Sequence, residues 1–426
     1  MTYTFRSLRG FNYRMWASGA IVSNVGTWMQ RVAQDWLVLT QLTHHNATAV
    51  GVVTALQFAP QVALLPLTGY ATDRLDRRKL LFATQAAMGV LALGLGALTI
   101  AGLVQLWHVY VFAGLLGCAS AFDSPARQTF VAELVGEEHL SNAVALNSTS
   151  FNVARMIGPA VAGVLIAAVG SGWVFLINAA SFAAVLGSLS MLRVDELHRT
   201  QGAEHTALSF AEGFRYIWRR PDLQAMMLMM FLVGTFGLNF PIFIATMSVT
   251  VFHQGASQYG ALTSMMALGS IAGALLAARR ERPRLTLLHA GAAIFGCGCG
   301  LAAVMPNYGL YGLALVLVGA SAQTFTTTVV STVQLSTEPA MRGRVIAILL
   351  AIAMGGTPVG APIVGWVADK YGPRWAMGIG AASGIAAAAV GLVYLALYHG
   401  LRVRMEAGRL RFLLDERARG ELRQEA

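Results

Sequence analysis

The chain has 426 residues, of which 56% are hydrophobic and only 12% are charged. Soluble domains carry about 25% charged residues, so the composition excludes an ordinary soluble domain and indicates a protein that crosses a membrane many times. The net charge of +10 does not indicate a nucleic-acid partner, because the basic residues follow a topological pattern described below.

Twelve apolar stretches follow one another along the chain, each long enough to cross a bilayer. We predict membrane-spanning helices at 12–41, 48–69, 80–102, 107–130, 142–168, 172–192, 222–249, 257–279, 285–304, 308–334, 344–368 and 374–399. The fold class is therefore an all-α polytopic membrane protein. Between the second and third helices, Gly69–Lys79 forms a short, strongly charged turn.

The basic residues predict which side of the membrane each loop occupies, because Lys and Arg stay in the cytoplasm. When loops are assigned alternately, 26 of the 30 Lys and Arg residues fall on one side. Lys370 and Arg374 fall on the other, and Arg31 and Arg155 fall inside helices. Both termini are expected in the cytoplasm. The preference for Arg over Lys, with abundant Ala and Gly, suggests a GC-rich bacterial genome and hence the inner membrane.

An internal repeat divides the chain into halves. Shifted by 202 residues, Gly158–Gly163 aligns with Gly360–Gly365, and Trp173 with Trp375. Two parallel six-helix halves, with a substrate site between them, are typical of facilitator-type transporters. We predict an N-terminal bundle at 1–192, a cytoplasmic linker with an amphipathic helix at 193–221, a C-terminal bundle at 222–400, and a cytoplasmic amphipathic tail, interpreted as a helix, at 401–426.

Several segments resemble one family. The spacing Gly69-x-x-x-Asp73-Arg74-x-x-Arg77-Arg78-Lys79 resembles the loop between helices 2 and 3 of major facilitator superfamily transporters. Ser23–Ala33, Asp123–Gln128 and Asn147–Gly163 resemble the enterobactin-exporter-like and macrolide-efflux-like drug:proton antiporters of that superfamily. The resemblance implies two six-helix bundles related by a pseudo-two-fold axis, and a transporter that exports small molecules.

The resemblance also implies a cytoplasmic gate, formed by Gly69, Asp73, Arg74, Arg77, Arg78 and Arg127. Asp73 is expected to contact Arg127 and the start of the helix near Arg342–Arg344, whose N-terminal dipole favours an anion. The chain departs from the family pattern in two places. Asp76 stands where Gly is usual, and the equivalent loop after Gly273 lacks the Asp.

The motif Gly158-Pro159-x-x-Ala162-Gly163 resembles the helix 5 signature of exporters. Small residues let helices approach closely, and a Pro bends a helix by freeing a backbone carbonyl. The resemblance implies a hinge at Gly158, Pro159 and Gly163. Ordinary membrane packing explains the small residues equally well.

Four ionisable residues lie inside predicted helices: Arg31, Asp35, Asp123 and Arg155. Such residues are functional candidates by default, and we predict that Asp35 or Asp123 carries a coupling proton while the arginines modulate it. A permanent structural ion pair is the alternative, both for Arg31 and Asp35, which share a helix face, and for Asp123. The Arg of typical antiporters has no counterpart within Val109–Gly117, which puts the usual relay in doubt.

The C-terminal half offers neutral polar and aromatic residues instead. We predict that Phe236, Asn239, Phe240, Gln323 and Thr327 line a cavity for an amphiphilic molecule. Hydrogen bonding between helices and contact with lipid are the alternative roles for about half of such residues.

The leading interpretation is a proton-coupled exporter of drugs or siderophore-like metabolites that acts as a monomer in the bilayer. A facilitator-fold importer or lipid flippase, and a membrane assembly factor or sensor, remain alternatives. An enzyme is not expected, because the chain has no nucleotide-binding Gly-x-x-x-x-Gly-Lys-Ser/Thr loop. No cofactor or metal is expected, since Cys118, Cys297 and Cys299 lie in apolar helices.

Overall fold

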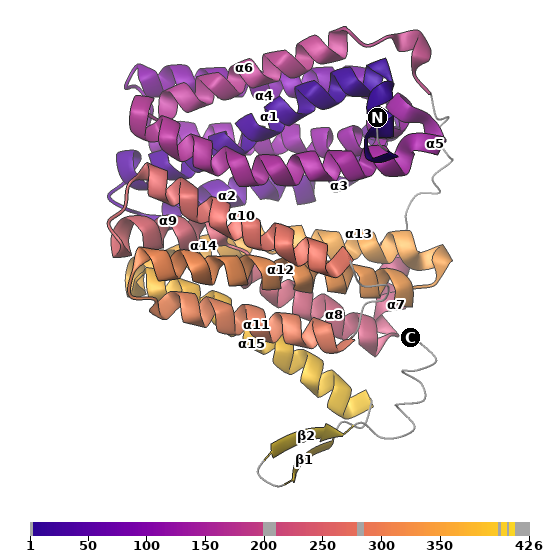
Figure 1. Ribbon diagram of the computed structural model, residues 1–426, viewed down its shortest axis with the longest axis vertical. Coiled ribbons are helices and arrows are strands. Elements are labelled where there is room, and N and C mark those ends of the chain that lie inside the picture. The colour runs from indigo at the N-terminus through magenta and orange to yellow at the C-terminus, as the bar shows by residue number, and fades with distance from the viewer. Residues whose placement is uncertain (1–2, 199–209, 279–284, 399–401, 407–408, 414–426) are drawn as a thin grey trace.

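The computed structural model describes residues 3–198, 210–278, 285–398, 402–406 and 409–413. They form two helical bundles, which lie one above the other in Figure 1. The N-terminal bundle contains α1 (Phe11–Trp36), α2 (Ala47–Ala63), α3 (Leu65–Arg74), α4 (Arg77–Ile100), α5 (Leu106–Val169) and α6 (Ser171–Ser190). The C-terminal bundle contains α8 (Pro221–Leu232), α9 (Phe240–Thr246), α10 (Ala256–Ala278), α11 (Leu285–Val304), α12 (Tyr308–Ser336), α13 (Pro339–Gly355), α14 (Thr357–Tyr371) and α15 (Pro373–Tyr398).

The predicted number of spans is confirmed. Nine helical stretches in the described residues are long and apolar enough to cross a membrane, including both arms of α5, which reverses direction at Gly136. Gly136 adopts φ +67 there, a conformation that glycine takes without strain. The shorter apolar helices Ala47–Ala63 and Leu288–Val304 and the more polar α1 supply the remaining three spans.

Three helices predicted as continuous are interrupted, and each interruption lies next to a proline. The stretch 48–69 breaks at Leu64, and 344–368 breaks at Gly356. The stretch 222–249 breaks at Leu238 and Asn239, where π-helical turns flank α9. Proline lacks the N–H that would continue the helical ladder. At the last break the Asn239 amide donates to the carbonyl oxygen of Thr235 at 2.7 Å, which satisfies part of the freed backbone.

The two bundles contact each other mainly towards one end in Figure 1, where α5 packs on α10 and α2 packs on α14. We call this end the far face, since it lies opposite the arginine-rich loops. Glycines allow the close approach: a Cβ at Gly163 would lie 2.6 Å from the Ala256 carbonyl oxygen, and one at Gly365 would lie 2.5 Å from that of Ala47. Neither position has room for a side chain.

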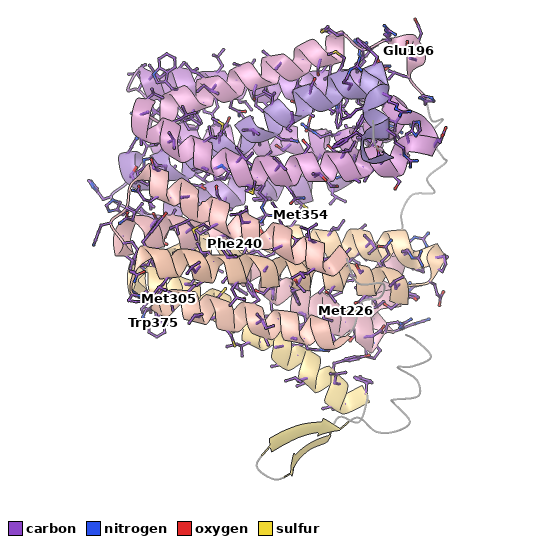
Figure 2. All side chains as sticks on the ribbon, in the orientation of Figure 1. Glu196, Met226, Phe240, Met305, Met354 and Trp375 are labelled. Carbon is purple, nitrogen blue, oxygen red and sulfur yellow. The ribbon has the colours of Figure 1, made fainter. Side chains whose placement is uncertain are left out.

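At the opposite end, the arginine-rich face, the bundles separate (Figure 1). There α3 packs chiefly on α2 and α5 of its own bundle, and a Cβ at Gly69 would meet no atom within 4 Å. Met354, labelled in Figure 2 at the level of the division between the bundles, is 39% exposed. The described residues therefore form a molecule that is closed at the far face and open towards the arginine-rich face.

Outside the bundles, α7 (Phe210–Trp218) forms within the predicted linker and packs on α13. Its Glu212 pairs with Arg344 at 3.3 Å. The predicted tail helix is wrong in its described part, where β1 (Arg402–Glu406) pairs antiparallel with β2 (Arg409–Leu413). The sequences Arg-Val-Arg-Met-Glu and Arg-Leu-Arg-Phe-Leu alternate with a period of two, which is a strand pattern.

Candidate functional site

Asp35 lies in the last turn of α1, immediately before a π-helical turn at Leu37–Leu42. Its side chain is buried and accepts a hydrogen bond from the Tyr259 hydroxyl of α10 at 3.2 Å. The neighbouring Trp36 ring stacks on the Tyr259 ring, with centroids 6.2 Å apart. Asp35 is therefore joined to the other bundle, and within the described residues it forms no salt bridge with Arg31.

A second carboxylate also joins the bundles at the far face. Asp369, near the end of α14, accepts hydrogen bonds from the backbone N–H groups of Ala47 at 2.7 Å and Thr48 at 2.9 Å, and from the Thr48 hydroxyl at 2.5 Å. The first N–H groups of a helix lack partners within it and attract anions. Asp369 thus caps α2 from the opposite bundle. No motif in the sequence pointed to this residue.

We call the contacts Asp35–Tyr259, Asp369–α2 and Gly163–Gly260 the far-face gate. The predicted hinge residues belong to this region. Gly163 and Pro159 touch α10 around Gly260, while Gly158 packs against the Trp28 side chain of its own bundle. The helix 5 motif therefore supplies one surface of the contact between the bundles, and its role as a hinge stays a prediction.

Asp123 lies in a different setting, entirely inside the N-terminal bundle. Its carboxylate pairs with Arg127 at 2.9 Å and accepts hydrogen bonds from Gln85 at 2.7 Å and Thr84 at 3.0 Å. Arg127 also donates to Asn24 at 3.3 Å. A carboxylate so fully satisfied by fixed neighbours favours the structural alternative raised above for Asp123.

We expect Asp123→Asn to lower stability and to leave proton coupling intact. Asn keeps the contacts to Thr84 and Gln85 but leaves the charge of Arg127 unpaired, and breaking a buried pair in this way costs on the order of 3 kcal/mol. The variant should therefore melt at a lower temperature than the parent protein in detergent, yet carry substrate-driven proton flux in vesicles. Normal stability would contradict the structural assignment.

The predicted gate residues of the loop at 69–79 bind their own bundle. Arg77 pairs with Glu133 of α5 at 2.6 Å, Arg78 donates to the Leu189 carbonyl at the end of α6 at 2.9 Å, and Arg74 lies 5.4 Å from the Tyr70 ring. Sequence reasoning missed Glu133 as a partner. The Asp73 side chain lies outside the described residues, and its predicted partners contact other groups: Arg127 pairs with Asp123, and Arg344 with Glu212.

The unusual Asp76 has a local explanation. It is the N-cap residue of α4, and its carboxylate accepts a hydrogen bond from the Lys79 backbone N–H at 3.0 Å. Asp is among the residues preferred at this position, and Gly is less favourable. The substitution therefore stabilises the start of α4.

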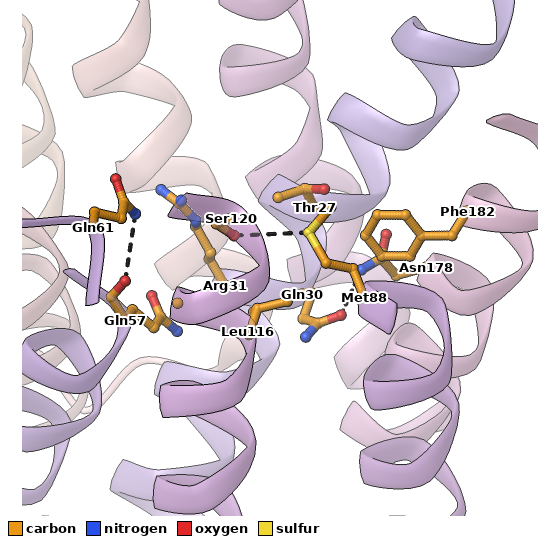
Figure 3. Close-up of a pocket in the computed structure, with 11 residues that line it drawn as sticks. Thr27, Gln30, Arg31, Gln57, Gln61, Met88, Leu116, Ser120, Asn178 and Phe182 are labelled. Atoms are coloured by element: carbon orange, nitrogen blue, oxygen red, sulfur yellow. Dashed lines mark hydrogen bonds between the residues drawn. The ribbon is translucent and has the colours of Figure 1, made fainter. Parts of the chain in front are cut away.

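Arg31 and Arg155 approach the same aromatic side chain. The Arg31 guanidinium carbon lies 5.0 Å from the Trp28 ring centroid and 5.7 Å from that of Phe58, and the Arg155 carbon lies 5.8 Å from Trp28. We call Trp28, Arg31 and Arg155 the arginine–tryptophan cluster. Arg31 also lines a small cavity of about 30 Å³ in the N-terminal bundle. Figure 3 shows Arg31 beside Gln57, Gln61 and Ser120, with Asn178 and Phe182 at the other end of the cavity.

The predicted cavity residues of the C-terminal bundle divide into two groups. Asn239 and Phe240 are buried, with Phe240 packed edge-on against Phe243 and Phe295. Phe236, Gln323 and Thr327 are half-buried, and the Gln323 amide donates to the Thr327 hydroxyl at 3.1 Å. The second group is thus the more accessible to a bound molecule.

Comparison with known proteins places the chain among membrane transporters. Residues 3–407 match the family model described as "Transmembrane secretion effector". The chain is 24% identical to the staphyloferrin A transporter of Staphylococcus aureus over 91% of its own length and 97% of the relative. It is 26% identical to the multidrug efflux pump Tap of Mycolicibacterium fortuitum (83% and 88% covered). It is 25% identical to the enterobactin exporter of Citrobacter koseri (86% and 87% covered).

A solved structure supports the fold alone. A bacterial homologue of the human lysosomal transporter Spinster, in an inward-facing conformation, superimposes with a TM-score of 0.70 at 15% identity. The superposition covers 93% of this chain and 97% of that structure. The architecture of two six-helix bundles is therefore shared with a transporter of very different sequence.

Proposed function

The chain belongs to the transmembrane secretion effector family of the major facilitator superfamily, and from this membership we propose that it exports amphiphilic small molecules, siderophore-like metabolites or drugs, in exchange for protons. The membership confirms the resemblance drawn from Gly69–Lys79, and the chain is a transporter and not an enzyme. Relatives that carry siderophores and drugs support the substrate class.

The observation that carries the proton-coupling proposal is the hydrogen bond between Asp35 and Tyr259, because it joins a buried acid to the contact between the bundles. In the proposed cycle, opening of the far face separates α1 from α10 and exposes Asp35 to water, where it takes up a proton. An ionised carboxylate inside a closed apolar interface is costly, so the neutral acid favours closure. Release of the proton towards the arginine-rich face then accompanies substrate binding there.

We propose that the arginine-rich face is cytoplasmic, which follows from the preference of basic residues for that side. Both termini then lie in the cytoplasm of a bacterium, and the transporter acts as a monomer in its inner membrane. In this orientation the conformation described here is closed to the outside and open to the cytoplasm. That state is the one in which an exporter collects its substrate.

An accumulation screen in a pump-deficient bacterial host tests the function. Expression of the chain should lower the cellular content of at least one compound among dyes, antibiotics and siderophores, and a protonophore should abolish the difference. Higher accumulation would indicate an importer, and movement of labelled lipid between leaflets would indicate a flippase. Unchanged accumulation of every compound would contradict export and favour an assembly or sensing role.

A further inference from the structure

We infer that the arginine–tryptophan cluster binds an anionic group of the transported molecule, so that the preferred substrates are organic anions bearing carboxylates. This inference rests on the proposed export function and narrows its substrate class. Its basis is the geometry and the charge balance around Trp28.

The two arginines come from different helices and converge. Arg31 lies on α1 and Arg155 on the second arm of α5, yet both guanidinium carbons lie within 6 Å of the Trp28 ring centroid, at 5.0 and 5.8 Å. They are therefore no more than about 11 Å apart. The Phe151 ring meets Trp28 at 5.8 Å, so the cluster offers aromatic surface as well. Two cations beside two rings suit an aromatic or amphiphilic polyanion.

The cluster carries more positive than negative charge. In the part of the chain that the structure describes, neither arginine forms a salt bridge. Asp35 is near enough to act electrostatically on Arg31, but its carboxylate bonds Tyr259. Asp123, the other buried acid among the described side chains of the N-terminal bundle, is held by Arg127. A charged group inside the membrane is costly, and each cation–π contact offsets only about 0.5–2 kcal/mol of that cost. We therefore infer that a mobile anion supplies the counter-charge for the two arginines.

Arginine is suited to this role and not to proton transfer. It stays protonated in proteins, and its planar fork binds carboxylates through two parallel hydrogen bonds. The cavity beside Arg31 adds neutral hydrogen-bonding side chains from Gln57, Gln61 and Ser120. At about 30 Å³ it admits only water-sized groups. It can therefore accommodate water around the charged end of a substrate, while the rest of the molecule lies outside it.

Two xanthene dyes test the inference, because they share a ring system and differ in charge. Carboxyfluorescein is a polyanion and rhodamine 123 is a cation. Binding of each to the full-length protein in nanodiscs is measured by fluorescence anisotropy, with citrate as a competitor. We expect carboxyfluorescein to bind more tightly than rhodamine 123 and citrate to displace it. Arg31→Gln and Arg155→Gln should each weaken carboxyfluorescein binding by about 10-fold or more, the loss expected for one charged hydrogen-bonding partner.

Arg193→Gln is the matched control, because Arg193 is an exposed surface residue paired with Glu196 and should leave binding unchanged. If the Gln variants do not fold, Arg31→Lys and Arg155→Lys keep the charge without the fork and should weaken only the anionic dye. Equal or tighter binding of rhodamine 123 by the parent protein would overturn the inference. So would anion binding that is indifferent to Arg31 and Arg155.

Liposomes loaded with each dye separate this inference from the export function. Binding of carboxyfluorescein at the arginines without transport of either dye, together with unchanged accumulation of every compound in the screen, would support the anion site and contradict export. Transport of rhodamine 123 in preference to the anion, unchanged by the Gln variants, would support export and overturn the anion site.

Discussion

Asp35→Asn is expected to abolish proton-driven export while leaving the fold intact. Asn has nearly the same shape and can still accept the hydrogen bond that the Tyr259 hydroxyl donates at 3.2 Å, but it cannot bind and release a proton. The effect should be complete and not graded, because no proton can then be exchanged for the substrate. Substrate-driven proton flux in inverted vesicles is the measurement, with the variant at the background of empty vesicles.

Two variants serve as controls for this result. Tyr259→Phe removes the hydrogen bond but leaves the acid, so coupling should persist at a reduced rate. Asp123→Asn should couple normally, as argued from its contacts with Arg127 and Gln85. Normal coupling in Asp35→Asn would rule out Asp35 as the carrier, and normal coupling in both acidic variants would end the proton-carrier hypothesis for this chain.

Gly163→Ala should hold the far face apart and strongly reduce transport. The added Cβ would lie 2.6 Å from the Ala256 carbonyl oxygen, which belongs to a helix backbone and cannot move aside alone. Overpacking of this kind costs about 1–3 kcal/mol, which lowers the ratio of closed to open far faces by about 5- to 160-fold. Labelling of a cysteine placed at Val50, a buried residue near the far-face end of α2, should become correspondingly faster.

Gly187→Ala provides the comparison for this variant. Gly187 lies in α6, is exposed, and has open space where its Cβ would stand, so the same chemical change should alter neither labelling nor transport. Slow labelling in Gly163→Ala, equal to the parent, would mean that the gate closes without the glycine contact.

The sequence predicts the membrane-spanning stretches well and the interruptions within them poorly. Apolar length predicts where the chain crosses the membrane, because lipid demands long apolar helices. It does not show that the stretch 222–249 opens at Asn239, since a polar residue beside a proline is also compatible with a gently bent helix. The prediction of a helix in the tail was wrong for a related reason, because the Arg and Leu residues in 402–413 fit one face of a helix as well as an alternating strand.

Two pairs with the same spacing show why the site was only half predictable. Asp123 and Arg127 lie four residues apart and form an ion pair. Arg31 and Asp35 lie four residues apart and do not, because Tyr259, 224 residues further along the chain, bonds the carboxylate. Helical spacing identifies possible partners. Which of these partners binds the carboxylate depends on helices that come together only in the folded protein.

The cap that Asp369 places on α2 has a consequence for how such gates vary among relatives. The carboxylate is bound by the backbone N–H groups of Ala47 and Thr48, and every residue except proline supplies that group. These two backbone bonds therefore do not depend on which side chains stand at positions 47 and 48, whereas position 369 must keep an acceptor. A search for co-varying pairs would overlook these backbone bonds between the two halves, whereas an intolerance of proline at 47 and 48 would reveal them.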